Sequence, residues 1–145
     1  MSAAEDLQQQ IRQAIPLSDA MQFRIDALSM ESILVSAPLS PNLNIHGTGF
    51  AGSIYSVAVL AGWALCTHIL GEYGVDAELV VAKAEIRYRS PVTGDLQCKT
   101  CAGAAARESF IKGVRDRGKA VLLLDVEVGD RPDALLQAAY CAIAR

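Results

Sequence analysis

Residues 50–70 read FAGSIYSVAVLAGWALCTHIL, a stretch without Asp, Glu, Lys or Arg. Its length meets the ~20-residue requirement of a transmembrane helix. Two features argue against insertion of this stretch into a membrane. Neither flank carries a Lys/Arg cluster, and small or polar residues interrupt the apolar run: Gly52, Ser53, Ser56, Gly62, Thr67 and His68. A helix that is apolar on every side can equally be buried inside a soluble protein. We therefore expect a buried core helix and no membrane partner.

The residues around this stretch set the limits of the expected helix. Thr48 suits the N-cap position, and Gly71 and Gly74 suit its far end. A helix of ~20 residues is about 30 Å long, enough to cross a small domain. Its small residues would let a sheet approach closely; they are Ala51, Ala58, Ala61, Gly62 and Ala64.

The segments before the helix predict one amphipathic helix and one hairpin. Apolar residues recur at helical spacing over residues 3–14, and Pro16 ends this pattern. Residues 21–27 alternate between apolar and polar side chains, as a half-buried strand does. A second strand over 33–37 is expected to pair with it through the turn at 29–31.

The segments after the helix are mostly strands. We expect strands over 78–90, 96–104 and 120–128, a turn over 91–95 and a short helix over 107–117 that ends at Gly118. The tail, 133–145, has the Ala and Leu content of a helix but also alternates acceptably as a last strand. The predicted fold is α+β: a single domain over residues 1–145 with one long central helix wrapped by an antiparallel sheet.

The bulk composition narrows the classes of function and partner. Of the 145 residues 52% are hydrophobic and 20% charged, with a net charge of −3. A mildly acidic chain has no general attraction for phosphate backbones, so nucleic acid is not expected as a partner. Residues 1–10 are polar and acidic rather than basic and then apolar, which argues against a signal peptide.

Four cysteines include one C-x-x-C pair, Cys98 and Cys101. Such a pair can be half of a zinc site or a redox couple. No second pair follows at ligand spacing, and the segment reads as a strand, on which residues three apart point to opposite faces. We therefore expect no metal and no cofactor, and free thiols that fit a reducing cytoplasm.

The loop before the central helix is the candidate site. It contains two asparagines, a histidine and two glycines, in the order Asn42, Asn44, His46, Gly47, Thr48 and Gly49. Amides at a helix N-terminus are unpaired donors with partial positive charge. Glycines let a ligand oxygen reach backbone N–H groups, so this loop could stabilise an oxyanion.

Two interpretations of the polar side chains in this loop remain open. His46 could donate to a carbonyl or act as a base, or it could merely satisfy the loop backbone. Asn42 and Asn44 could orient water and substrate, or they could be turn formers that bond their own backbone.

The loop and helix carry a resemblance to a known family. Asn42 to Ser53 follow the pattern Asn-x-Asn-x-x-Gly-Thr-x-Phe-x-Gly-Ser, and Leu60-Ala61-Gly62-Trp63 comes shortly after. These residues resemble the thioesterase family typified by the YiiD C-terminal domain, which has the hot-dog fold. The turn at 90–95 resembles that of hot-dog thioesterases generally. The resemblance spans nearly the whole chain.

The resemblance implies an enzyme that hydrolyses acyl-CoA or acyl-carrier thioesters at the start of the central helix. It implies a homodimer, with dimers of dimers left open, joined edge to edge by its sheets. Gly47 and Thr48 would supply oxyanion amides, with catalytic Asn42, Asn44 and His46 beside them. Substrate contacts would come from Gly49, Phe50, Ser53, Tyr55 and Ser56. Apart from the resemblance, Arg87 and Arg89 share one strand face and suit the phosphates of CoA, with a merely solvated face as the alternative.

One departure from better-characterised hot-dog thioesterases bears on the mechanism. Their helix carboxylate, nine positions beyond the loop histidine, is replaced by Tyr55, and no Asp or Glu occurs between Gly47 and Gly71. His46, or a carboxylate such as Glu85 or Asp95, would have to act instead. A non-catalytic acyl-CoA binding or regulatory module is the alternative. Enoyl-thioester hydration or dehydration is a further one, disfavoured by the missing acid.

Overall fold

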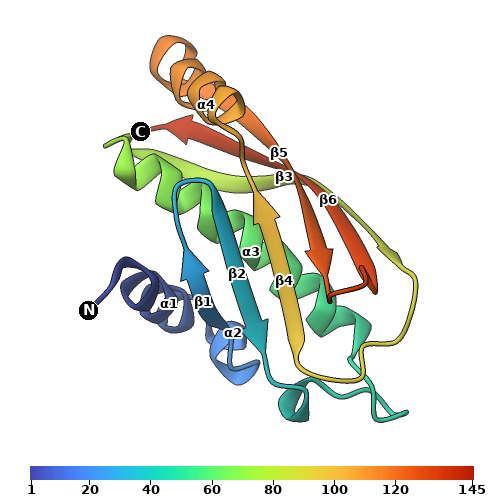
Figure 1. The fold of residues 1–145 in the computed structure, drawn as a ribbon. Helices are drawn as coiled ribbons and strands as arrows, with labels where there is room; N and C mark the ends of the chain where they lie inside the picture. The colour runs from blue at the N-terminus through green and yellow to red at the C-terminus, as the bar shows by residue number, and fades with distance from the viewer.

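Helix α3, Ala51–Glu72, forms the centre of the molecule. The computed structural model describes residues 1–145, and in it a six-stranded sheet curves round this helix (Figure 1). It is the one helix long and apolar enough to cross a membrane, yet 61% of its most apolar window is buried inside the fold. The expectation of a buried core helix is confirmed.

The sheet is antiparallel throughout, with the strand order β1-β2-β4-β5-β6-β3. Its strands are β1 Arg24–Leu28, β2 Ser32–Ala37, β3 Ala77–Tyr88, β4 Leu96–Cys101, β5 Lys119–Val128 and β6 Ala134–Ala144. Strands β4 and β5 pair only at Cys98 with Val128 and at Lys99 with Glu127. This short seam lets the sheet bend round α3, so the hot-dog arrangement predicted from sequence is confirmed.

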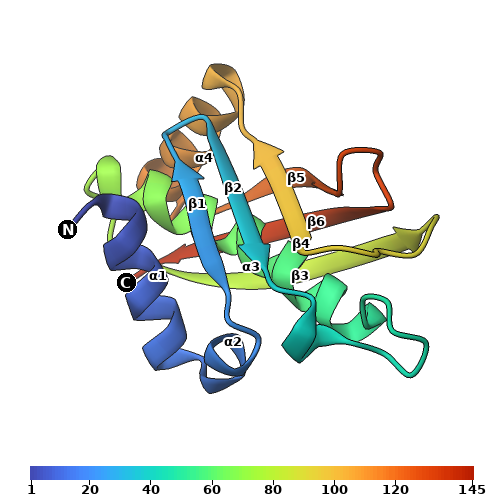
Figure 2. The ribbon, with the colours of Figure 1, turned by 60° about the horizontal axis from the view of Figure 1, so that its bottom comes forward.

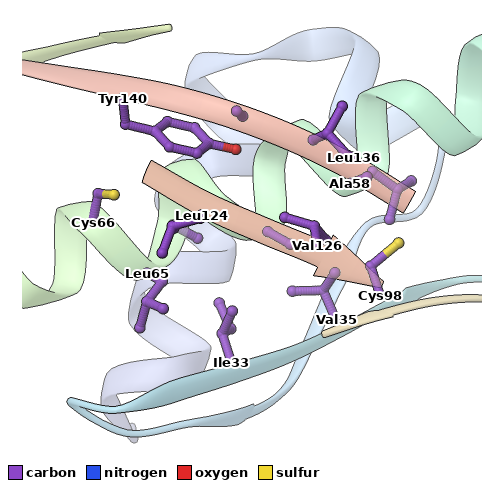
Figure 3. Close-up of a cluster of buried hydrophobic side chains, with 14 of the residues drawn as sticks. Ile33, Val35, Ala58, Leu65, Cys66, Cys98, Leu124, Val126, Leu136 and Tyr140 are labelled. Atoms are coloured by element: carbon purple, nitrogen blue, oxygen red, sulfur yellow. The ribbon is translucent and has the colours of Figure 1, made fainter. Parts of the chain in front are cut away.

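Alternation along the strands places one apolar face of the sheet against α3. In β5 every second residue is buried, from Ala120 to Val128. Tyr140 of β6 points its ring toward the helix (Figure 3) and donates its hydroxyl to the Val59 carbonyl at 2.8 Å. A Cβ at Gly62 would overlap that hydroxyl. The small residue at position 62 therefore permits the close helix–sheet approach expected from sequence.

Two helices precede the sheet. Helix α1, Ala3–Ala14, begins with a capping box between Ser2 and Glu5 and lies beside β1 (Figure 2). Pro16 ends α1 but also starts a second short helix, α2 Pro16–Ala20, because proline fits the first helical position. Sequence patterning missed α2. It also started the first strand three residues early.

Several predicted boundaries are corrected in the structure. Phe50, not Thr48, is the N-cap of α3, and a 3₁₀ helix η1, Ser40–Asn42, lies before the loop. Helix α4, Ala104–Arg117, starts where the preceding strand was expected to continue, and Gly118 ends it with φ +76°. The tail is strand β6, which pairs with both β5 and β3. Pairing on both sides overrides the helical propensity of its Ala and Leu residues.

The C-x-x-C pair lies in β4 with its thiols on opposite faces, as expected. Cys98 is fully buried and Cys101 is exposed. Burial raises the pKa of the Cys98 thiol to about 12. All four cysteines are free, and no group of three His, Cys, Asp or Glu side chains comes together as a metal site.

Candidate active site

The loop over residues 43–49 is closed by the side chain of Asn44. Its Oδ1 accepts from the backbone N–H of His46 at 2.8 Å and of Thr48 at 3.1 Å. Its Nδ2 donates to Thr48 Oγ1 at 2.8 Å and to the Gly49 carbonyl at 3.2 Å. Asn44 therefore acts as a turn former, one of the two interpretations left open by the sequence.

The two amides predicted as oxyanion donors are engaged inside this loop. Thr48 N–H points at Asn44 Oδ1, and Gly47 N–H donates to the Asn44 carbonyl at 3.3 Å. Gly47 has φ +79°, the left-handed conformation that lets the loop reverse here. The geometry therefore points away from Gly47 and Thr48 as donors to a ligand.

Free donors occur instead at the first turn of α3. No side chain caps the helix, and the first helical bond runs from Ile54 N–H to the Phe50 carbonyl. The N–H groups of Ala51, Gly52 and Ser53 have no acceptor within the chain. The aligned peptides of a helix of 22 residues add partial positive charge at these amides. Sequence reasoning missed them because taking Thr48 as the cap starts the helix too early.

A surface hollow of about 350 Å³ lies at this first turn. Its walls come from α2, η1 and α3: Leu17, Ala20, Met21, Pro41, Asn42, Phe50, Gly52, Ser53 and Ser56. No charged side chain lines it. The walls from α2 had no signal in the sequence, since α2 itself was not predicted.

Asn42 lines the hollow, and its side chain holds an unpaired acceptor that solvent does not reach. Its Nδ2 donates to the carbonyls of Met21, at 3.0 Å, and Pro38, at 2.8 Å. Two carbonyl partners fix the orientation of the amide, so Oδ1 is the remaining atom. That oxygen is buried and has no hydrogen-bond partner. A buried unpaired acceptor costs ~1–3 kcal/mol, which favours a donor arriving from the hollow.

The two serines of the first turns differ. Ser56 Oγ donates back to the Gly52 carbonyl at 2.8 Å, as helical serines often do. Ser53 is buried, and its hydroxyl makes no hydrogen bond within the chain. Both line the hollow, as the sequence predicted for residues just inside the helix.

Of the remaining predicted residues of the loop and helix, only Phe50 lines the hollow. His46 is exposed and its ring makes no hydrogen bond; only its backbone N–H is engaged. Gly49 is buried and donates to the Val92 carbonyl at 2.8 Å, so it anchors the loop. Phe50 is half exposed, with its ring beside Gly52. Tyr55 is exposed and does not line the hollow.

The end of β3 reaches the same helix turn. Tyr88 Oη donates to the Ala51 carbonyl at 2.8 Å. Burial, and then the nearby Tyr55, raise the pKa of Tyr88, which keeps this hydroxyl a donor. Arg87 and Arg89 flank Tyr88 in sequence and are exposed, and Arg87 shares the strand face of Glu85, opposite the face from which Tyr88 reaches α3.

Neither candidate carboxylate lines the hollow. Glu85 is exposed opposite Gln137, on the face of the sheet away from α3. Asp95 accepts from Leu39 N–H at 3.3 Å and pairs with Arg24 at 3.7 Å.

Comparison with known proteins agrees with this architecture. Residues 4–140 match the model of a family described as "Putative thioesterase (yiiD_Cterm)". The chain belongs to this thioesterase family. A protein of known structure, described as a putative thioesterase from Shewanella oneidensis, is 32% identical to this chain and has a TM-score of 0.83. The similarity covers 97% of this chain and 96% of that protein.

More distant structures show that the hot-dog fold of the family is widely shared. A protein from Chlorobaculum tepidum has a TM-score of 0.93 at 24% identity, covering 98% of this chain and 94% of its own. A thioesterase from Haemophilus influenzae has a TM-score of 0.72 at 14% identity, covering 99% and 92%. Membership of this family supports thioester hydrolase activity in general.

Proposed function

We propose that the protein hydrolyses acyl-CoA or acyl-carrier thioesters in the hollow at the start of α3. The observation that carries this proposal is the pairing of unsatisfied groups there. The amides of Ala51, Gly52 and Ser53 offer donors, and Asn42 Oδ1 offers a buried acceptor. Hydrolysis needs both: donors for the carbonyl oxygen and an acceptor for the attacking water.

The proposed reaction follows from these roles. Water attacks the thioester carbonyl carbon, and a small movement of the wall on substrate binding opens the buried Asn42 Oδ1 to accept one hydrogen of that water. The carbonyl oxygen becomes an oxyanion bonded to the helix amides, in place of Gly47 and Thr48 of the sequence-based prediction. The C–S bond then breaks, and the thiolate leaves and takes up a proton. Preorganised donors of this kind contribute on the order of 10²–10³ in rate.

His46 is the proposed base that removes the proton from water. Its ring is accessible and has no hydrogen-bond partner within the chain, so it is free to take this part. No carboxylate of α3 competes for the role, because the segment from Gly47 to Gly71 contains none.

We further propose that Arg87 and Arg89 bind the phosphates of CoA. Both are exposed at the end of β3, the strand end that contacts Ala51 through Tyr88, and a CoA nucleotide lying over this strand end would meet their side chains. An Arg89→Gln variant should raise KM for an acyl-CoA several-fold and leave KM for the matching acyl-pantetheine, which has no nucleotide, unchanged. Equal effects on both substrates would remove the arginine from phosphate binding.

A second copy of the chain is the proposed partner, with cytoplasm as the compartment. Strand β3 has β6 on one side only, and Val80, Val81 and Tyr88 are exposed along it. A long, apolar free edge is a template for pairing with another strand. Ala82 lies at a bulge outside the β3–β6 register, so Ala82→Pro should spare the fold and convert a dimer on a sizing column to a monomer.

Thiol release from acyl-CoA substrates of increasing length tests the proposed activity. We expect turnover by the wild-type protein. Tight binding of CoA esters with no turnover would select the non-catalytic binding module instead, the alternative that Tyr55 in place of a helix carboxylate keeps open. Loss of the conjugated-bond absorbance of crotonyl-CoA without release of thiol would select hydration.

A further inference from the structure

A second hollow, of about 550 Å³, lies between α1 and α3. Five of its seven lining residues are hydrophobic, and none is charged; they are Leu7, Gln10, Ile11, Gln13, Ala14, Ile15 and Trp63. This volume exceeds that of the hollow at the first turn of α3. Its apolar walls suit a hydrocarbon rather than a polar ligand.

The two hollows follow one another along a single face of α3. Ser56 lines the first and Trp63 the second. A separation of seven residues brings both side chains to the same side of the helix, about 10 Å apart along its axis. The opposite wall is also continuous in the chain, because α1 ends in the second hollow and α2 borders the first.

We infer that these hollows form one acyl groove and that the substrate is a long-chain acyl thioester. This inference rests on the proposed hydrolase function. With the carbonyl at Gly52, the alkyl chain runs past Ser56 toward Trp63, a span of about 16 Å along the helix axis. That span matches an extended chain of about twelve carbons. Short acyl groups would leave the part of the groove between α1 and Trp63 empty.

Trp63 marks the far part of the groove and can report its occupation. Its Nε1 donates to the Leu79 carbonyl at 3.2 Å, which fixes the ring against β3. It is also the single tryptophan of the chain. The intrinsic fluorescence of the protein therefore comes from a residue that an acyl chain in this groove would touch.

The test is a fluorescence titration of the full chain with alkyl thioethers of CoA, which cannot be hydrolysed. Dodecyl-CoA should shift Trp63 emission to shorter wavelength and bind at least tenfold more tightly than butyl-CoA. CoA alone should give no shift. Equal dissociation constants for the two alkyl lengths, or no emission change on saturation, would overturn the groove.

A blocking variant and a matched control sharpen the test. Ala14 is exposed and lines the groove, so the larger side chain of Ala14→Phe should fill it. The ratio of the dissociation constants of butyl-CoA and dodecyl-CoA should fall at least tenfold. Gln9 is exposed on the same helix outside the groove, and Gln9→Phe should bind as wild type. Identical behaviour of the two variants would contradict the inference.

The outcome for the groove is separable from that for the activity. A chain-length preference in thioether binding without thiol release from any acyl-CoA keeps the groove and rejects the hydrolase. Thiol release with equal kcat/KM on butyryl-CoA and lauroyl-CoA keeps the hydrolase and rejects the groove.

Discussion

Asn42 and Asn44 lie two residues apart and use their amides in different ways. Every polar atom of the Asn44 side chain has a partner within the loop over residues 43–49. Asn42 bonds two carbonyls through Nδ2 and leaves Oδ1 buried without a partner. The backbone repeats the contrast, since the amides of Gly47 and Thr48 are satisfied and those of Ala51 to Ser53 are not.

This difference separates scaffold from site. A loop that satisfies its own hydrogen bonds gains rigidity and has little left for a ligand. A helix start with free donors beside a free buried acceptor carries an energetic cost that a ligand can relieve. The comparison assigns structural support to residues 43–49 and chemistry to the first turn of α3.

The largest expected effect comes from deleting a free helix amide. Ala51→Pro and Gly52→Pro each remove one N–H in the first helical turn, where proline is best tolerated. A Cβ at Gly52 would lie 2.6 Å from the Phe50 ring, so Gly52→Ala, which keeps the N–H, is the matched control at that position. The variant that deletes the oxyanion donor should lose on the order of 10²–10³ in kcat, measured by thiol release. Ala51→Ser keeps the N–H and should retain wild-type kcat. Full activity in both proline variants would place the oxyanion elsewhere.

The next effect concerns His46, the one polar side chain of the loop that makes no hydrogen bond within the chain. If His46 is the base, His46→Ala should lower kcat by roughly 10², the lower range for general base catalysis. His68→Gln, at the other histidine of the chain, should change kcat little. Activity of His46→Ala equal to wild type would leave His46 with only its backbone contact to Asn44.

A smaller loss is expected from Asn42→Ala. Removing Oδ1 should lower kcat about tenfold at nearly unchanged KM, since a neutral hydrogen bond to water contributes ~0.5–1.5 kcal/mol. The substitution also removes Nδ2, the donor to the Met21 and Pro38 carbonyls, and should lower stability. Activity should therefore be measured well below the melting temperature of the variant. If KM rises and kcat holds, Asn42 contacts substrate rather than the attacking water.

The smallest effect on activity should come from Asn44→Ala. This change frees the His46 and Thr48 amides and should cost about 2 kcal/mol of unfolding free energy, while kcat stays within about threefold of wild type. Urea denaturation and the same assay measure the two quantities. A loss of kcat larger than that of Asn42→Ala would reverse the assignment of scaffold and site.

Most of the fold was predictable because burial imposes clear periodicity. The uncharged run at 50–70 indicates a long apolar helix, the alternation in β5 indicates a half-buried strand, and Gly118 indicates the end of a helix. The tail was ambiguous because its Ala and Leu residues suit a helix, and only pairing with β5 and β3 decides for a strand. Helix α2 is not apparent from the sequence, because a proline that ends one helix can also start the next.

The candidate site could be located from sequence but not resolved atom by atom. The polar loop before an apolar helix predicts a site within residues 42–56. Asn42, Ser53 and Ser56 of that segment line the hollow. Which amides are free depends on the register of the helix start, and Thr48 and Phe50 compete for the cap. An asparagine in a turn can suggest that its side chain bonds the local backbone. The four hydrogen bonds of Asn44 can be identified only in the folded loop.

A ¹H–¹⁵N NMR titration with a trifluoromethyl ketone analogue of an acyl-CoA tests the central claim most directly, because the ketone presents an oxyanion-like oxygen. The account predicts the largest amide proton shifts at Ala51, Gly52 or Ser53, and only small ones at Gly47 and Thr48. Large shifts at Gly47 and Thr48, with the first turn of α3 unchanged, would contradict it.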